Sequence, residues 1–193
     1  MISCVDIMLK KAYILIVKYL IIEKINSNIL NISFTRRKNM DYIKYIRSLV
    51  GHKPIMLTAA SVILLNKKNQ ILLQKRVDNH LWGYCGGYIE MYEEVEDAAK
   101  RELFEETGLK ANSVELFNVF SGEELKFSYP NGDVVNIIDI VFICKDYEGN
   151  LVRQVEEVEE LAFFDIDKIP QELSPPTIPA LKSFVDYYQA KGK

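Results

Sequence analysis

One stretch constrains this chain more than any other: residues 93–107 favour a helix that carries apolar and acidic side chains on a single stripe. The stretch is rich in Glu, Ala, Lys, Arg and Leu, and Gly108 stands where a helix would end. At about 100° per residue, one side of this helix collects Val95, Ala98, Ala99, Glu102, Glu105, Glu106 and Leu109. The small apolar residues predict that its first turns lie close against a sheet.

The later turns of the same stripe place three carboxylates together. Glu102, Glu105 and Glu106 stand at i, i+3 and i+4, so we expect their side chains to converge and to need a positive partner. Lys100 and Arg101 are adjacent, but we expect both to point away from the cluster centre. Oxygen ligands suit Mg²⁺ or Mn²⁺, and the lack of a nearby His or Cys disfavours zinc. A solvated acidic helix face is the alternative for such a Glu-rich stretch.

The remaining patterns predict strands with few helices. We expect a strand over 57–65, a polar turn over 66–69 and a second strand over 71–75 that together form a hairpin, followed by a glycine-containing loop over 83–87. Further strands are expected over 114–120 and 161–164, and Asn131-Gly132 predicts a hairpin between 125–129 and 134–144. Helices are expected over 42–50 and 178–190. This pattern favours an α/β fold in which helices pack on a mixed sheet.

The first 39 residues differ in charge from the rest of the chain. They hold seven basic and two acidic residues, a net charge of +5, and leave −8 for residues 40–193, since the whole chain carries −3. The apolar run over 12–22 is interrupted by Lys18 and is too short to span a bilayer, which needs about 20 apolar residues. We interpret residues 1–39 as an extension or a start placed too early, with a basic membrane-surface helix as the alternative. Residues 40–56 form a short helix and lead-in, and 57–190 the main domain.

Charge and cysteine content exclude several classes of protein. A negative net charge is unusual for a protein that holds nucleic acid through nonspecific contacts. The cysteines, Cys4, Cys85 and Cys144, are odd in number and far apart, which argues against a disulfide framework and favours a reducing, cytoplasmic setting.

The spacing around the helix is more specific than its composition. Residues 87–109 fit the pattern GX5EX7REUXEEXGU at all nine specified positions, where U is a bulky aliphatic residue. The segment resembles the Nudix box of the Nudix hydrolases, and the resemblance extends more loosely over 57–170. It implies the Nudix fold, an α/β/α sandwich with a mixed central β-sheet. Many relatives have Pro-Gly-Gly before the box, whereas here Cys85 precedes Gly86-Gly87.

The resemblance also implies roles for residues of the box. Glu102, Glu105 and Glu106 would bind Mg²⁺ (or Mn²⁺), and Gly87 would offer its backbone carbonyl. Glu93 would position the helix or a water, with Arg101 as its ion-pair partner. Leu103 would pack inward, and Gly108 would end the helix.

Outside the box the assignments rest on position in the chain. The general base is either a box glutamate such as Glu105 or a glutamate of 155–160, where we favour Glu157 and Glu160. Arg76 is the best phosphate contact, with Lys75 facing away, and a plain surface charge at the end of the strand is the alternative for Arg76.

The aromatic and reactive residues near the box leave two interpretations open. Trp82 and Tyr84 either stack on a substrate base or pack as core. We expect His80 to be a surface residue and Cys85 a buried packing residue.

The resemblance implies an Mg²⁺-dependent hydrolase that splits a phosphoanhydride bond in a nucleoside diphosphate linked to another moiety, such as ADP-ribose, a nucleotide sugar or a nucleoside triphosphate. The alternative is a catalytically silent nucleotide-binding or regulatory module on the same fold. We expect a small nucleotide as partner, no specific nucleic acid, no stable membrane insertion, and allow for a homodimer.

Overall fold

The computed structural model describes residues 42–129 and 131–191. Its helices are α2 (Tyr42–Val50), α3 (Val95–Thr107) and α4 (Ile178–Lys191), with short 3₁₀ helices η1 (Glu123–Leu125), η2 (Ile166–Lys168) and η3 (Pro175–Thr177). Its strands are β1 (Ile55–Leu64), β2 (Ile71–Arg76), β3 (Trp82–Gly83), β4 (Cys85–Tyr88), β5 (Leu109–Phe120), β6 (Lys126–Ser128), β7 (Val134–Gly149) and β8 (Val158–Phe164). The predictions for residues 1–39 lie outside the described residues.

Two sheets form the centre of the domain. The larger has the order β4-β1-β7-β5, with β6 added along β7, and the smaller has the order β3-β2-β8. β1 and β7 run parallel over ten paired positions, from Ile55↔Val135 to Leu64↔Cys144, whereas the other pairs are antiparallel. The sheet is therefore mixed, as the sequence predicts.

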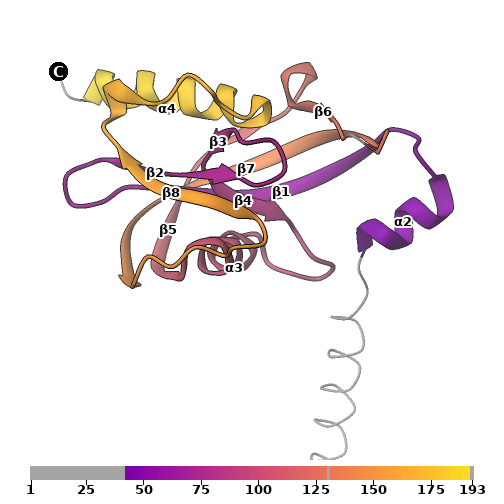
Figure 1. Cartoon of the computed structure of the whole chain (residues 1–193), viewed down its shortest axis with the longest axis horizontal. Helices are drawn as coiled ribbons and strands as arrows, with labels where there is room; N and C mark the ends of the chain where they lie inside the picture. Colours follow the sequence, from indigo (N-terminus) through magenta and orange to yellow (C-terminus); the bar gives the residue numbers. More distant parts are fainter. Residues whose placement is uncertain (1–41, 130, 192–193) are drawn as a thin grey trace, which may run out of the picture. The chain divides into compact units, whose positions relative to one another are not determined.

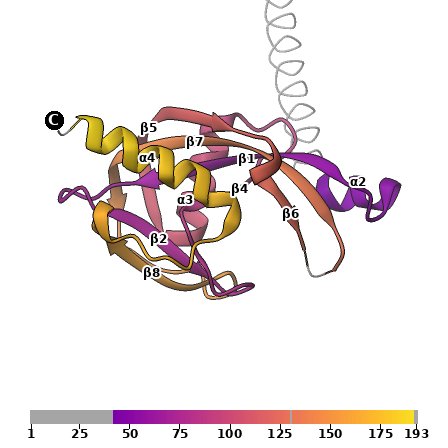
Figure 2. The same ribbon diagram turned by 90° about the horizontal axis from the view of Figure 1, so that it is seen from above.

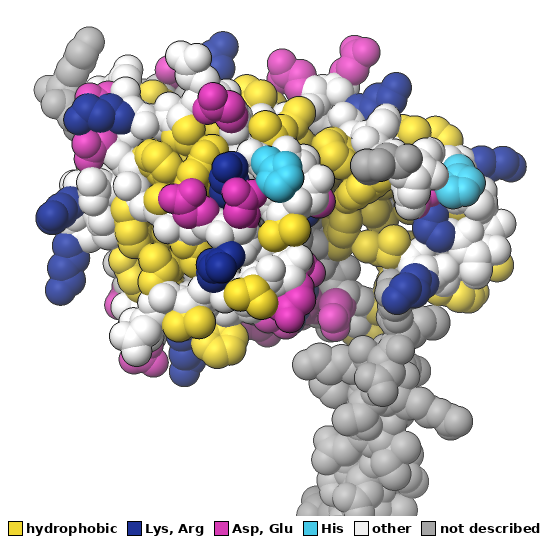
Figure 3. All heavy atoms as spheres, viewed as in Figure 1, with side chains coloured by type: hydrophobic (Ala, Val, Ile, Leu, Met, Phe, Trp, Pro, Cys, Tyr) yellow, Lys and Arg dark blue, Asp and Glu magenta, His cyan; other side chains and the backbone are white. Residues whose placement is uncertain are grey.

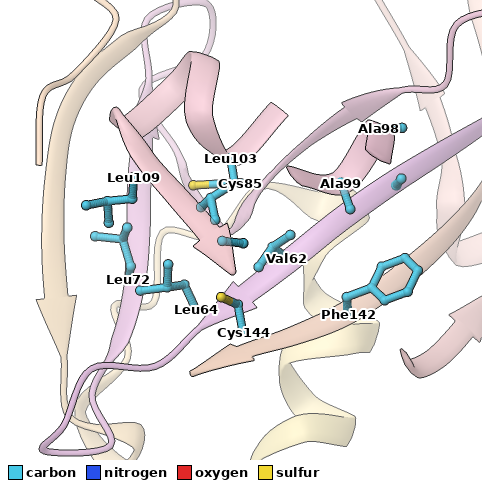
Figure 4. Packing of buried hydrophobic residues seen from close by; sticks show 12 residues of the cluster. Val62, Leu64, Leu72, Cys85, Ala98, Ala99, Leu103, Leu109, Phe142 and Cys144 are labelled. Carbon is cyan, nitrogen blue, oxygen red and sulfur yellow. The ribbon is translucent and has the colours of Figure 1, made fainter. Parts of the chain in front are cut away.

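The helices α3 and α4 cover opposite sides of the strands (Figure 1). Alternate residues of each strand face opposite sides, so β1 and β7 contribute to two separate cores. Ala60, Val62 and Phe142 pack with Ala99 and Leu103 of α3 (Figure 4). The second core, under α4, consists of Ile63, Leu65, Ile71, Leu73, Tyr84, Val141, Ile143, Ala180, Leu181 and Phe184. This arrangement is the predicted α/β/α sandwich.

The hairpin predicted over 57–75 is wrong in its pairing. The chain does reverse there, because the Asn66 N–H donates to the carbonyl of Gln70 (3.1 Å) and Leu65 forms an isolated bridge with Ile71. Beyond that bridge the strands separate into different sheets. Both edges of β1 are already taken, by β4 and β7, so β2 pairs with β3 and β8 instead.

The loop predicted over 83–87 is also wrong, since two short strands occupy that region. β3 pairs with β2 and β4 pairs with β1, with Gly86 and Gly87 opposite Ser61 and Ala60. Glycine is a turn residue in sequence patterns, but in a strand it also marks a place where another group comes close. Here those groups are Ser61 and Glu102, which a Cβ on Gly86 or Gly87 would strike.

The other predicted elements are present. The Asn131-Gly132 hairpin joins β6 to β7, with Gly132 at φ +88°. Gly108 ends α3 in the left-handed conformation (φ 71°), and its N–H donates to the carbonyl of Phe104.

The surface seen in Figure 3 mixes acidic, basic and apolar side chains. In the part of the chain that the structure describes, no helix combines the length and the hydropathy needed to cross a bilayer.

Candidate active site

A pocket of about 670 Å³ lies where β4, the outer strand of the larger sheet, meets α3. Glu102, Glu105 and Glu106 of α3 all line this pocket, with Gly86 and Gly87 of β4 beside them. The three carboxylates therefore share one cavity instead of spreading into separate regions of solvent. The solvated-face alternative does not describe Glu106, which is 3% exposed.

Glu106 is the most strongly perturbed carboxylate of the three. Burial raises its pKa to about 8, although the Gln74 amide and the Gly86 N–H, which donates to Oε2 at 3.0 Å, favour the charged form. The negative charge of Glu102 adds to the rise in pKa. A nearby cation would stabilise the ionised form of such a buried carboxylate.

Arg101 points into the acidic group, contrary to the expectation that it points away. Its Nη1 donates to Oε1 of Glu102 (2.6 Å) and to Oε2 of Glu105 (3.0 Å). Its Nε and Nη2 bind the two oxygens of Glu93 (2.7 and 2.9 Å), the ion pair that the resemblance implies. Helical spacing fixes the direction of the Cα–Cβ bond, but the arginine side chain is long enough for its guanidinium to reach back to three carboxylates.

Glu102 lies directly against the backbone of Gly87. A Cβ built on Gly87 would stand 2.5 Å from Cδ of Glu102, so only glycine leaves room for the carboxylate there. Burial raises the pKa of Glu102; Arg101 opposes the rise, and the charges of Glu105 and Glu157 add to it. Glu105 is 54% exposed at its side chain.

The donor set fits a hard divalent cation in its chemistry. It offers carboxylate oxygens, and the buried side-chain oxygen of Gln154, another pocket residue, has no hydrogen-bond partner in the structure. As the side chains of the described residues stand, no three acidic, His or Cys groups converge tightly enough to hold an ion. The predicted convergence is therefore incomplete, because Arg101 occupies Glu102 and Glu105.

The structure separates the two glutamates proposed as general base. Both are exposed, but Glu157 lines the pocket, whereas Glu160 lies on β8 opposite Lys75 in β2 and is not among the residues that line it.

Arg76 also lines the pocket, and its guanidinium forms a two-bond ion pair with Asp78 (2.9 and 3.0 Å). Lys75 binds Glu159 (3.2 Å).

Trp82 does not line the pocket, contrary to its selection as a substrate residue. Its ring packs edge-on against Phe164, with centroids 4.9 Å apart, at the margin of the core under α4. Trp82 lies on β3, which pairs with β2, and its contacts agree with the packing interpretation. His80 is a surface residue beside Glu159, and Cys85 is buried, with burial raising the pKa of its thiol.

Several pocket residues were not found from the sequence, whereas Tyr84 was named there as an aromatic candidate and both lines the pocket and belongs to the core under α4. Ser61, Tyr84 and Asp139 form a buried hydrogen-bonded group, and Tyr88, Phe127 and Tyr129 form an aromatic wall. One signal was available: Asp139 is the lone charge within the apolar run over 134–144.

The NUDIX domain profile matches residues 56–186. The chain belongs to the Nudix family. This Nudix chain is 34% identical over 111 residues to an ADP-ribose pyrophosphatase of Methanocaldococcus jannaschii, a match that covers 56% of the chain and 62% of that protein. It is 25% identical over 141 residues to the NAD-capped RNA hydrolase NudC of Actinobacillus succinogenes, covering 68% of the chain and 49% of that protein.

Solved structures show the same fold. The MutT NUDIX hydrolase of Burkholderia pseudomallei superimposes with a TM-score of 0.58 at 26% identity, over 66% of this chain and 97% of that one. The chain spans less than two thirds of the length of both curated relatives above.

Proposed function

We propose that the protein is an Mg²⁺-dependent (or Mn²⁺-dependent) pyrophosphohydrolase that cleaves the phosphoanhydride bond of a nucleoside diphosphate linked to another moiety. ADP-ribose, a nucleotide sugar and a nucleoside triphosphate all belong to this class. The observation that supports it most is the buried, incompletely neutralised Glu106 beside Glu102 and Glu105 in one pocket. Oxygen-rich, negatively charged sites of this kind suit the hard cations that accompany phosphates.

Each box residue has a proposed task in this scheme. Glu102, Glu105, Glu106 and the Gly87 carbonyl would hold the cation, whose contribution is to neutralise phosphate charge and acidify the attacking water. Arg101 and Glu93 hold the acidic side chains in place through the ion pairs described above. Arg76 would bind a phosphate oxygen, sharing its guanidinium with Asp78.

Glu157 is our proposed general base. It lines the pocket, and its charge contributes to the raised pKa of Glu102, which places the two carboxylates within electrostatic reach. A carboxylate there can accept the proton of the attacking water. Glu160→Gln is the matched control, since it makes the same change three residues away, at another exposed glutamate that does not line the pocket. We expect Glu157→Gln to lower kcat by about 100-fold or more and Glu160→Gln to leave it unchanged.

A substrate panel tests the activity itself. Purified protein is incubated with Mg²⁺ and ADP-ribose, nucleotide sugars or nucleoside triphosphates, and the products are identified after reaction in ¹⁸O-labelled water to locate the broken bond. Glu105→Gln should abolish most turnover, while Glu96→Gln, an exposed glutamate at the start of the same helix, should not. Nucleotide binding without turnover of any member would favour the silent binding module instead.

A further inference from the structure

The pocket continues past the acidic group to the other side of the larger sheet. On β1 and β7, Ala60, Val62, Phe142 and Cys144 belong to the core under α3, while Ile63, Val141 and Ile143 belong to the core under α4. By strand alternation Ser61 and Asp139 therefore face α4, although both line the same pocket as the glutamates of α3. Gly86 and Gly87 of the edge strand β4 line the same pocket, Gly86 against Ser61 and Gly87 against Glu102.

Asp139 is the charged group at this second end. It is 5% exposed, and each of its oxygens accepts one hydrogen bond: Ser61 Oγ donates to Oδ1 and the Tyr84 hydroxyl donates to Oδ2, both at 2.7 Å. Burial raises the pKa of Asp139, and these two donors oppose the rise by favouring the carboxylate. Ser61 and Tyr84 are themselves buried, so the group is held rigidly.

Asp139 lines the pocket, and its carboxylate still has acceptor capacity. Its two oxygens offer about four lone-pair sites, and the two hydroxyls use one on each oxygen. One site remains on each oxygen, so the complementary ligand presents two parallel N–H donors. A ligand with one donor beside one acceptor fits poorly, because the lone pair of its acceptor would face, and be repelled by, the second carboxylate oxygen.

The surroundings of Asp139 suit a flat ring. Ile137, Phe127 and Pro176 supply apolar lining from β7, β6 and η3. Figure 1 shows α4, which follows directly after η3, covering this side of the strands. Apolar walls with one oriented polar group are the usual composition of a small-molecule site.

Among the common bases, guanine carries two adjacent donors on its Watson–Crick edge, N1–H and the N2 amino group. Adenine and cytosine each present a donor beside an acceptor, and hypoxanthine has N1–H alone. We propose that Asp139 binds the Watson–Crick edge of a guanine base, with Ser61 and Tyr84 as its positioning residues. This inference rests on the proposed function, and it narrows the substrate to guanine nucleotides whose phosphates lie toward α3.

Calorimetric titration with mononucleotides tests the inference without any hydrolysis, because GMP, IMP, AMP and XMP contain no phosphoanhydride bond. With the full-length protein and Mg²⁺, GMP should bind about 10- to 100-fold more tightly than IMP or AMP, the discrimination typical of one two-bond base contact. Equal dissociation constants for GMP and IMP, or tighter binding of AMP, would overturn the inference. Neither result would affect the proposed hydrolase activity, which the substrate panel tests separately.

The substitution Asp139→Asn adds a specificity reversal. The amide offers one acceptor and one donor, which match N1–H and O2 of xanthine, so XMP should replace GMP as the preferred ligand. Asp146→Asn, on an exposed part of the same strand, is the matched control and should keep the GMP preference. A folded Asp139→Asn protein that still ranks GMP first would refute the contact. Should that variant fail to fold, the wild-type GMP and IMP affinities still decide the question.

Discussion

The contact between Gly87 and Glu102 gives the sharpest prediction about the acidic group. In Gly87→Ala the new Cβ would lie 2.5 Å from Cδ of Glu102, whereas ordinary contacts begin at 3.4 Å. The carboxylate must therefore retreat by about 0.9 Å, the difference between these distances. Mg²⁺ demands oxygen ligands at about 2.0–2.1 Å in near-octahedral geometry, so a displacement of this size removes Glu102 from productive coordination.

The expected result is weaker metal binding in a folded protein. Because the obstructing atoms are the end of a flexible side chain, Gly87→Ala should fold, while its affinity for Mn²⁺ falls about 10- to 100-fold. Binding of Mn²⁺ followed by electron paramagnetic resonance gives the affinity independently of turnover, and circular dichroism confirms the fold. Gly51→Ala is the control for the same chemical change, since a Cβ there meets nothing within 4 Å, although its left-handed φ of +62° adds a backbone strain that Gly87→Ala lacks. Unchanged Mn²⁺ affinity in Gly87→Ala would refute the assignment of Glu102 as a ligand.

Three further results are expected from the same packing and charges. Burial raises the pKa of Glu106 from 4.5 to about 8, so protonation of Glu106 stabilises the folded, metal-free protein. This stabilisation should be full below about pH 4.5 and lost as the pH rises through 8. Thermal melts in a chelator should show the loss in the wild type and not in Glu106→Gln. Leu103→Ala should lower the free energy of unfolding by about 2–5 kcal/mol in urea titrations, because Leu103 is fully buried between α3 and the sheet. Gly108→Ala should cost about 1–2 kcal/mol by the same assay, from its left-handed φ and a Cβ 3.0 Å from the Asn150 carbonyl; a loss below about 0.5 kcal/mol would contradict that reasoning.

Local chemistry explains which parts of the fold can be predicted from the sequence. The extent of α3, its end at Gly108 and the hairpin at Asn131-Gly132 depend on residues a few positions apart, so composition and periodicity are sufficient. The separation of β1 and β2 into different sheets depends on β7, which lies more than 60 positions further along the chain and competes for the edge of β1. No local pattern carries that information.

The candidate site likewise has features that the sequence predicts and features that it does not. The box positions of Glu102, Glu105 and Glu106 follow from spacing, and the structure places them in one pocket. The direction of Arg101 does not follow, because its flexible side chain selects partners by charge once the helix has formed. Asp139 was missed because its partners, Ser61 and Tyr84, lie 78 and 55 positions away in the sequence and meet it only through sheet pairing.

The ion pairs of Arg101 bear on whether the protein needs a metal ion in order to fold. Zinc fingers are unfolded without their ion, because the free energy of metal binding supplies their folding free energy. Here a guanidinium within the same helix already offsets the charges of Glu93, Glu102 and Glu105, so the polypeptide carries its own counterion during synthesis. We therefore expect the domain to fold without magnesium, so that dialysis against a chelator yields a folded protein that regains the proposed activity when the ion is added back, with no refolding step.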